Sequence, residues 1–282
     1  MNSVERYYSR KRRRKKKAKV VFFTLLFILM VITLAILSMT VFFNAETITV
    51  DGNSRYSAAQ LLEQGGLTVG QNLFRLDKFE VIDKMEELPY VKTVVIKRKL
   101  PNELKVHVVE NQPVVWIPAQ GGAALLNEEY RVLEIVPLPV EGEGSEEPQP
   151  SPVEGIPQLT EVIPNEVVVG QTLQFGETDY TGFLKRLYDG FMAQSDLTWE
   201  QVQQVQFFAR YDIKVLYAQH VTIDFGALDQ VDTKLQLASH LIKANGTGQT
   251  ATVDVSDTKR VYYRPDRQLE QPEKDEDAEK KE

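Results

Sequence analysis

Residues 20–43 form an uninterrupted run of 24 residues without a charged side chain, a proline or a glycine. As an α-helix rising about 1.5 Å per residue, this run reaches roughly 36 Å, enough to cross the ~30 Å hydrocarbon layer of a membrane with some tilt. A cleavable signal peptide usually has a shorter apolar core and a small-residue cleavage site. The sequence therefore predicts one transmembrane helix over residues 20–43, in which Thr and Ser hydroxyls bond back to the helix.

A strongly basic cluster lies directly before the apolar run. Nine of the ten residues 10–19 are Lys or Arg, among them Lys15, Lys16, Lys17 and Lys19. An excess of Lys and Arg beside a span holds that side in the cytoplasm. We therefore predict a cytoplasmic tail over residues 1–19 and everything from Asn44 onward outside the cell, as in a single-pass type II protein of the cell membrane. The alternative for the basic cluster is contact with DNA or anionic lipid.

The charge balance changes sign across the span. Residues 1–43 carry ten Lys or Arg and one acid, Glu5, a net charge of +9; subtracting this from the formal −7 of the whole chain leaves −16 for residues 44–282. Binding of nucleic acid needs a net basic face, so the outer part is not expected to bind it. The chain has no cysteine, which excludes disulfides and thiol chemistry.

A first outer domain is predicted over residues 45–118. Strand patterns at residues 46–50, 91–97 and 104–109 flank two helix patterns, one over residues 58–64 with Ser57 and Gln60 at capping-box spacing and one that begins after Asp77. Apolar residues of the second helix recur at the three-to-four spacing of a helix and are predicted to form its buried stripe: Phe79, Ile82 and Met85, with Leu88 just beyond them. The predicted order is strand, helix, helix, strand, strand, a three-stranded sheet covered by two helices.

A second domain, predicted over residues 119–265, is richer in strands. A strand at residues 114–117, in a segment that begins near Gln112, precedes it. Within the domain, strands are expected at residues 123–126, 130–136, 201–208, 212–217, 221–225, 250–255 and 260–263, and helices at residues 181–193 and 229–244. Residues 138–157 are rich in Glu, Pro, Gly and Ser and are predicted to be a solvated acidic loop, and the charged tail 266–282 to be disordered. The expected fold class is α+β throughout.

The chain resembles the FtsQ/DivIB family of bacterial cell-division proteins, whose membrane-proximal module is a POTRA domain. The resemblance covers roughly residues 10–265, and the long acidic insertion after Pro137 departs from it. It rests on the order and spacing of several phrases in the first domain, namely residues 48–53, Ser57, 70–77, 88–91, 95–98, Pro101 and 106–113 with Glu110 and Pro113. Farther on, residues 156–159, 234–235, 253–255 and 261–265 fit the family's second, β domain.

The resemblance implies a scaffold that assembles partners and has no reaction or cofactor of its own. In the family the last strand of the β domain is where the partner docks, which here points to Arg260, Val261, Tyr262, Tyr263 and Arg264. The partners so implied are FtsB/DivIC-like and FtsL-like division proteins at the septum, and through them the septal peptidoglycan synthase complex. Residues 50–55 and 91–97 of the POTRA-like module are weaker candidates, and plain packing of the edge strand is the alternative for the Tyr and Arg residues.

Enzymatic function finds little support in the residues. The three histidines, His107, His220 and His240, are not spaced to form a helical metal pair, and no nucleophile elbow or phosphate cradle is visible. Asn245 begins an Asn-Gly-Thr phrase that we interpret as a helix end rather than a glycan acceptor. Two alternatives remain open: a membrane-anchored extracytoplasmic cell-wall enzyme or ligand sensor, and a POTRA-bearing secretion factor, which needs repeated POTRA units or a barrel.

Overall fold

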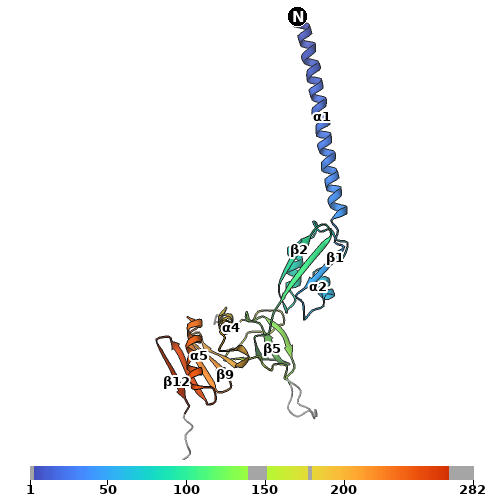
Figure 1. Ribbon diagram of the computed structural model, residues 1–282. Coiled ribbons are helices and arrows are strands. Elements are labelled where there is room, and N and C mark those ends of the chain that lie inside the picture. The colour runs from blue at the N-terminus through green and yellow to red at the C-terminus, as the bar shows by residue number, and fades with distance from the viewer. Residues whose placement is uncertain (1–2, 139–150, 177–179, 267–282) are drawn as a thin grey trace, which may run out of the picture. The chain divides into compact units, whose positions relative to one another are not determined.

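The computed structural model describes residues 3–138, 151–176 and 180–266, and it describes only the backbone of residues 3–18, 35, 40 and 41 (Figure 1). It divides into two compact units, Met1–Glu110 and Asn111–Glu282. The sequence places the end of the first outer domain near Pro118. The structure places the division eight residues earlier, because the strand that contains Pro118 pairs within the sheet of the second unit.

The first unit opens with one long helix, α1 (Ser3–Phe42), that continues through the basic cluster without a break. Its segment Lys19–Met39 is the one helix in the described part of the chain that is long and apolar enough to cross a membrane. As expected, hydroxyls in the span bond back to the helix: Thr24 donates to the Val20 carbonyl and Thr33 to the Leu29 carbonyl, each at 2.8 Å.

A three-stranded sheet covered by two helices follows α1, which confirms the predicted order. The elements are β1 (Thr47–Asp51), α2 (Ala58–Gln64), α3 (Lys78–Glu86), β2 (Val91–Lys99) and β3 (Glu103–Glu110). In the sheet β3 lies in the middle, parallel to β1 and antiparallel to β2. Both predicted helix starts are present, since Ser57 and Gln60 form the capping box of α2 and Asp77 accepts the Phe79 and Glu80 amides at the start of α3.

The predicted buried stripe of α3 is wrong at Phe79. That side chain is 76% exposed, and the buried residues of the helix are Val81 and Met85. A strict spacing of three drifts by about 60° around a helix at every step, so residues 79, 82 and 85 cannot share one narrow face. Close packing of Met85 is possible because its neighbour directly after α2 is Gly65, where a Cβ would lie only 2.5 Å from the Met85 Cε.

The second unit is built on a nine-stranded mixed sheet with the order β12-β11-β10-β9-β8-β7-β4-β5-β6. Its first strands are β4 (Val115–Ala119), β5 (Gly122–Leu126), β6 (Val132–Val136) and β7 (Gln158–Thr160). The helix α4 (Phe183–Ala193) and a 3-10 turn, Trp199–Gln201, precede the meander β8 (Val202–Ala209), β9 (Asp212–Tyr217) and β10 (Val221–Gly226). The helix α5 (Val231–Asn245) and the strands β11 (Ala251–Asp257) and β12 (Arg260–Pro265) complete the unit.

Two parallel connections organise this sheet. The chain passes from β7 through α4 to β8, and from β10 through α5 to β11, and in both cases the two strands are parallel neighbours. The two helices pack closely because α4 carries Gly190 at their contact, where a Cβ would lie 2.8 Å from Leu235 Cδ1. Residues 139–150 of the predicted acidic loop and the tail 267–282 lie outside the described residues, and residues 151–156 are mostly turn.

Candidate functional site

The strand β12 forms one end of the nine-stranded sheet. Within the described part of the chain it pairs with β11 alone, antiparallel, with Tyr263 opposite Val253 and Tyr262 opposite Asp254. A terminal strand has one row of backbone N–H and C=O groups without a partner strand, and such a row can bond an incoming extended segment. The predicted candidate residues 260–264 therefore all lie on a sheet edge.

The register decides which backbone groups face outward. The Asp266 amide donates to the Thr250 carbonyl at 2.9 Å, so the residue pair 250/266 is hydrogen-bonded. Hydrogen-bonded and non-hydrogen-bonded pairs alternate along an antiparallel ladder, which turns the backbone of Arg264 and Tyr262 toward β11. The N–H and C=O groups of Val261 and Tyr263 are consequently directed away from β11, and Pro265 offers only its carbonyl to the same row.

The side chains of β12 divide between the two faces of the sheet. Val261 and Tyr263 are half-buried and pack against the hydrophobic core, and Gln249 donates to the Tyr263 hydroxyl at 3.3 Å. On the other face Tyr262 is 46% exposed, and the Arg264 guanidinium lies 5.1 Å from the centre of its ring. Arg264 also forms a 3.4 Å ion pair with Asp254 on β11, a partner that the sequence analysis did not identify.

These features give the edge three kinds of contact for a partner strand. The outward backbone groups supply hydrogen bonds, the Tyr262 ring supplies an apolar surface, and the exposed Arg260 and Arg264 supply positive charge. Asp254 restrains Arg264, because charged and stacked side chains on adjacent strands hold each other in position. The arrangement suits an extended segment that carries an acidic side chain.

The weaker candidates in the first unit are in part already occupied. Glu110 accepts the backbone amides of Ser54 and Arg55 at 2.8 and 2.9 Å, which closes the segment after β1. The strand β2 lies at the other edge of the small sheet, and at one point this edge is capped, since the Val94 amide donates to Glu86 Oε1 at 3.2 Å. Part of the backbone of residues 50–55 and 91–97 is thus already hydrogen-bonded to carboxylates of the same unit.

The residues predicted to set the membrane topology lie on α1. Lys15, Lys16 and Lys17 fall in the part of the helix for which only the backbone is described, and Lys19 is exposed at the start of the apolar segment. They occupy a continuous helix directly before the span, the position at which Lys and Arg influence orientation.

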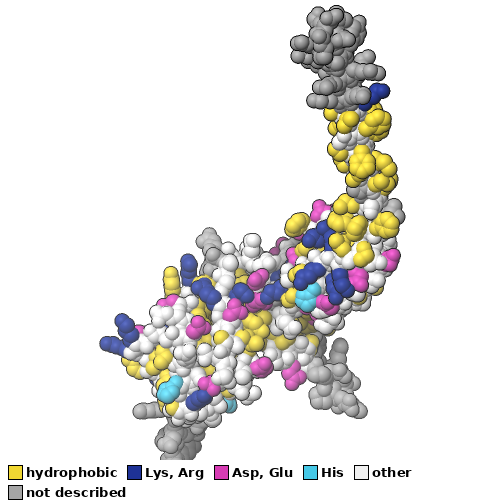
Figure 2. Space-filling model, turned by 45° about the horizontal axis from the view of Figure 1, so that its top comes forward, with side chains coloured by type: hydrophobic (Ala, Val, Ile, Leu, Met, Phe, Trp, Pro, Cys, Tyr) yellow, Lys and Arg dark blue, Asp and Glu magenta, His cyan; other side chains and the backbone are white. Residues whose placement is uncertain are grey.

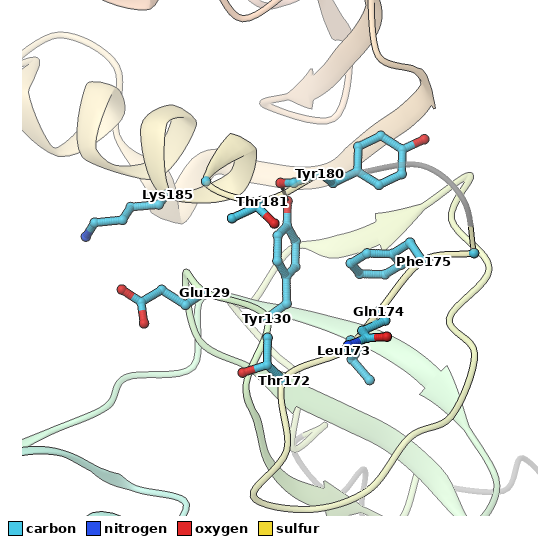
Figure 3. Close-up of a pocket in the computed structure, with 11 residues that line it drawn as sticks. Glu129, Tyr130, Thr172, Leu173, Gln174, Phe175, Tyr180, Thr181 and Lys185 are labelled. Atoms are coloured by element: carbon cyan, nitrogen blue, oxygen red, sulfur yellow. Dashed lines mark hydrogen bonds between the residues drawn. The ribbon is translucent and has the colours of Figure 1, made fainter.

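A hollow with a volume of about 600 Å³ lies beside a cluster of aromatic rings in the second unit (Figure 3). Tyr130 stands at its centre: its hydroxyl donates to the Tyr180 carbonyl and accepts the Leu184 amide, each at 3.1 Å. Phe175 packs edge-on against both Tyr130 and Tyr180. Because Tyr130 thereby fixes the start of α4, its role here is structural, although its positive φ of 62° was not expected from a predicted strand.

The histidines and the Asn-Gly-Thr phrase singled out in the sequence lie apart from one another in the part of the chain that the structure describes. No group of three His, Asp or Glu side chains there is placed to hold a metal ion. His107, His220 and His240 are all exposed and lie on separate elements. Asn245 ends α5, with its side chain donating to the Leu241 carbonyl at 2.8 Å.

These observations define a class of protein: one helix able to span a membrane, then a βααββ module, then an α+β unit with a free sheet edge. Comparison with known proteins agrees with this class. Residues 43–111 match the family described as POTRA domain, FtsQ-type.

Curated relatives extend the match along the chain. The cell division protein FtsQ of Corynebacterium glutamicum is 33% identical over 115 residues, which are 39% of this chain and 52% of that protein. The cell division protein DivIB of Clostridium acetobutylicum is 32% identical over 94 residues, 33% of this chain and 38% of that protein. The DivIB of Clostridium botulinum is 23% identical over 234 residues, 79% of this chain and 82% of that protein. The chain is therefore similar to the FtsQ/DivIB cell-division proteins, and it spans about half or less of the length of the first two of these relatives.

Proposed function

We propose that this protein is a membrane-anchored, non-catalytic scaffold of the bacterial cell-division machinery, which acts by holding partner proteins at the division septum. The observation that carries the proposal is the free β12 edge at the end of a chain similar to the FtsQ/DivIB cell-division proteins. Its relatives are named cell division proteins, which supports the process, and the arrangement of α1 supports the anchor.

The anchor places the two folded units outside the cell. The cations up to Lys19 stay in the cytoplasm, the apolar segment of α1 crosses the membrane, and the chain from Asn44 onward, which carries −16, lies on the far side. The basic cluster contacts the anionic headgroups of the inner leaflet rather than nucleic acid. A scaffold of this kind needs no cofactor.

The partner captured by β12 is a short extended segment of an FtsB/DivIC-like protein, which brings an FtsL-like protein with it. The segment adds a strand beside β12 through the backbone of Val261 and Tyr263, and the side chains of Tyr262, Arg260 and Arg264 select its sequence. The assembled complex then positions or restrains the septal peptidoglycan synthase.

A double substitution in the full-length protein tests the capture. Arg260→Glu reverses one of the selecting charges, and Val261→Pro removes an outward amide without breaking a bond to β11. We expect co-purification of the DivIC-like protein from membranes to be abolished, while membrane insertion and the unfolding curve of the protein stay unchanged. Undiminished co-purification of the DivIC-like protein would contradict the proposal.

A matched charge reversal serves as the control. Arg210 is an exposed arginine in the turn between β8 and β9, away from the β12 edge in the order of the sheet. Arg210→Glu changes the net charge by the same amount as Arg260→Glu, and we expect it to leave co-purification intact. Loss of the partner in both variants would point to a general charge effect rather than to the edge.

The rival function, a cell-wall enzyme or ligand sensor, depends on the hollow around Tyr130. A carboxylate pair would favour hydrolysis, but Glu129 is the one acidic side chain among the described residues that line this hollow. Part of its surroundings, residues 177–179, lies outside the described residues. The β12 edge is therefore the better supported site.

A further inference from the structure

Four large apolar side chains of the first unit are exposed close to the point where α1 enters it. Val69, Phe74, Phe79 and Leu100, here called the apolar collar, are between 44% and 76% exposed. None of them belongs to the β12 edge, and a water-exposed surface of this kind on a soluble domain usually marks a contact.

Hydrogen bonds attach the segment that carries Val69 and Phe74 directly to the end of α1. The Asn72 side chain donates to the Met39 carbonyl at 2.9 Å, and the Leu73 amide donates to the Phe43 carbonyl at 2.8 Å. The ring of Phe74 packs edge-on against Phe43 with 5.0 Å between the ring centres. The domain thus starts at the last turn of the helix, without a free linker between them.

The remaining collar residues lie beside the same junction. The Glu46 amide donates to the Asn102 carbonyl at 2.8 Å, which brings the β2–β3 turn with Leu100 next to the start of β1. Phe79 is in the first turn of α3, just after the segment bonded to α1. Figure 2 shows hydrophobic side chains continuing from α1 onto the adjoining part of the first unit, with Lys and Arg side chains beside them.

We propose that the apolar collar inserts into the boundary between headgroups and acyl chains of the same membrane that α1 crosses, so that the lipid surface holds the first unit against the bilayer. The proposal rests on the membrane anchoring in the proposed function. Its physical basis is that the collar directly continues the membrane-spanning helix. The apolar segment of α1 ends at Met39, so Phe43 and the Phe74 ring packed on it lie at the level of the headgroups.

The charges around the collar indicate that the contact is apolar rather than electrostatic. The segments 44–47, 69–80 and 98–103 carry four cations and four anions, which leaves no net charge: Arg75, Lys78, Arg98, Lys99, Glu46, Asp77, Glu80 and Glu103. Lys99 is moreover paired with Glu103 at 2.8 Å. Membrane contact of the collar should therefore depend little on the fraction of anionic lipid.

The absence of cysteine from the chain allows a direct test by single-cysteine labelling. Full-length Phe79→Cys, Leu100→Cys, Val109→Cys and Ile28→Cys are each labelled with the fluorophore NBD and reconstituted into phosphatidylcholine vesicles, with and without phosphatidylglycerol. The readouts are the emission maximum and quenching by lipids spin-labelled near the headgroup. Ile28 reports insertion of α1, and Val109 is the matched control, an exposed apolar residue about 20 Å farther along β3 than Glu103.

We expect blue-shifted emission and strong quenching at positions 79 and 100 in both lipid mixtures, and water-like emission at position 109. Adding Phe74→Gln and Phe79→Gln to the Leu100→Cys protein should reduce the quenching at position 100.

If position 28 is quenched while positions 79 and 100 behave like 109, the collar proposal fails and the anchoring stands. If position 28 is not quenched, the anchoring itself fails and takes this proposal with it. Shielding of positions 79 and 100 only in membranes that contain the other division proteins would show a protein occupant and overturn the lipid contact.

Discussion

At the scale of single residues, Lys234 is the one buried cation in the described part of the second unit. Its side chain is 2% exposed, and its ammonium group donates to the Phe225 and Ala227 carbonyls at 3.0 and 2.8 Å and to Asp229 Oδ1 at 2.6 Å. The Lys234 ammonium holds the pKa of the Asp229 carboxyl below its usual value. Three bonds from one side chain thereby close the turn between β10 and α5, the connection that leads to β11 and β12.

Replacing Lys234 by methionine keeps the aliphatic packing but removes all three hydrogen bonds. We expect Lys234→Met to lower the free energy of unfolding of the second unit by about 2–4 kcal/mol, because the buried Phe225 carbonyl and the part-buried Ala227 carbonyl lose their donor. Both tryptophans of the chain, Trp116 and Trp199, lie in this unit, so their fluorescence during urea unfolding of the detergent-solubilised protein measures the change.

Lys243 on the same helix is the matched control for this substitution. Its side chain is 60% exposed and pairs with Asp196 at 2.6 Å. An exposed ion pair contributes less than about 1 kcal/mol, so Lys243→Met should shift the unfolding curve only slightly. Equal effects of the two substitutions would show that burial of the Lys234 ammonium is not what stabilises the turn.

The sequence could not have predicted the role of Lys234. The helical pattern of α5 places it next to the apolar residue Leu235, and the family resemblance includes both residues without giving a reason. Its two carbonyl partners come from the end of β10 and the following turn, and a backbone acceptor has no signature in a sequence. Asp229 alone is visible as an opposite charge five residues away.

At the scale of elements, the carboxylate of Glu110 joins the end of β3 to the segment that follows β1. Glu110 at the end of β3 accepts the Ser54 and Arg55 amides and the Ser54 hydroxyl, just beyond β1. Desolvation alone would raise the pKa of Glu110, but these hydrogen bonds outweigh it and lower the pKa. The ionised form therefore stabilises the closed segment, and the sequence showed Glu110 only as part of a family phrase.

The sign of the pKa shift predicts how acid opens this segment. Because the folded-state pKa is lowered, the stabilisation is fully present above the ordinary pKa of a glutamate and is lost as the pH falls through the lower, folded-state value. We expect it to amount to about 1 kcal/mol, discounted for partial exposure. Hydrogen exchange of the peptide containing Ser54 and Arg55, corrected for the intrinsic rate at each pH, should show protection that decreases on acidification.

Glu110→Gln provides the comparison, since a glutamine keeps the shape of the side chain but does not titrate. In this variant the protection of the same peptide should be weaker at neutral pH and should not change over the acidic range. A wild-type protein with pH-independent protection would contradict the assigned role of the carboxylate.

The elements themselves were largely predictable, and the exceptions have clear causes. Local signals such as the Ser57–Gln60 capping box and the Asp77 cap located both helices of the first unit. The strand β7 was missed because it has only three residues and is stabilised by neighbours from distant parts of the chain, β4 on one side and β8 on the other. Phe79 was misplaced because spacing alone does not fix the rotation of a short helix.

At the scale of the whole molecule, the position of the candidate site follows from topology more than from composition. The sequence predicted β12 as the last strand with Tyr and Arg residues, and a last strand often lies at an edge. It did not predict that β10 and β11 are parallel through α5, which is the arrangement that leaves β12 outermost. Nor did it predict the Asp254 partner of Arg264, because that pairing depends on the register of β11 and β12.

The proposed scaffold also requires that the chain cross the membrane with its C-terminal part outside the cell. Protease shaving of intact cells measures this orientation. With tags at both termini, external protease should digest the chain beyond residue 43 and leave the N-terminal tag protected, because the basic cluster holds that side inside. Lys15→Gln, Lys16→Gln, Lys17→Gln and Lys19→Gln together remove four of the nine cations in residues 10–19 and should shift a fraction of molecules to the opposite orientation. The same change at Lys78, Lys97, Lys99 and Lys105, on the other side of the span, increases the asymmetry and should invert none. A wild-type chain whose C-terminal two-thirds resists the protease while its N-terminal tag is lost would place β12 in the cytoplasm, where it could not meet a partner outside the membrane.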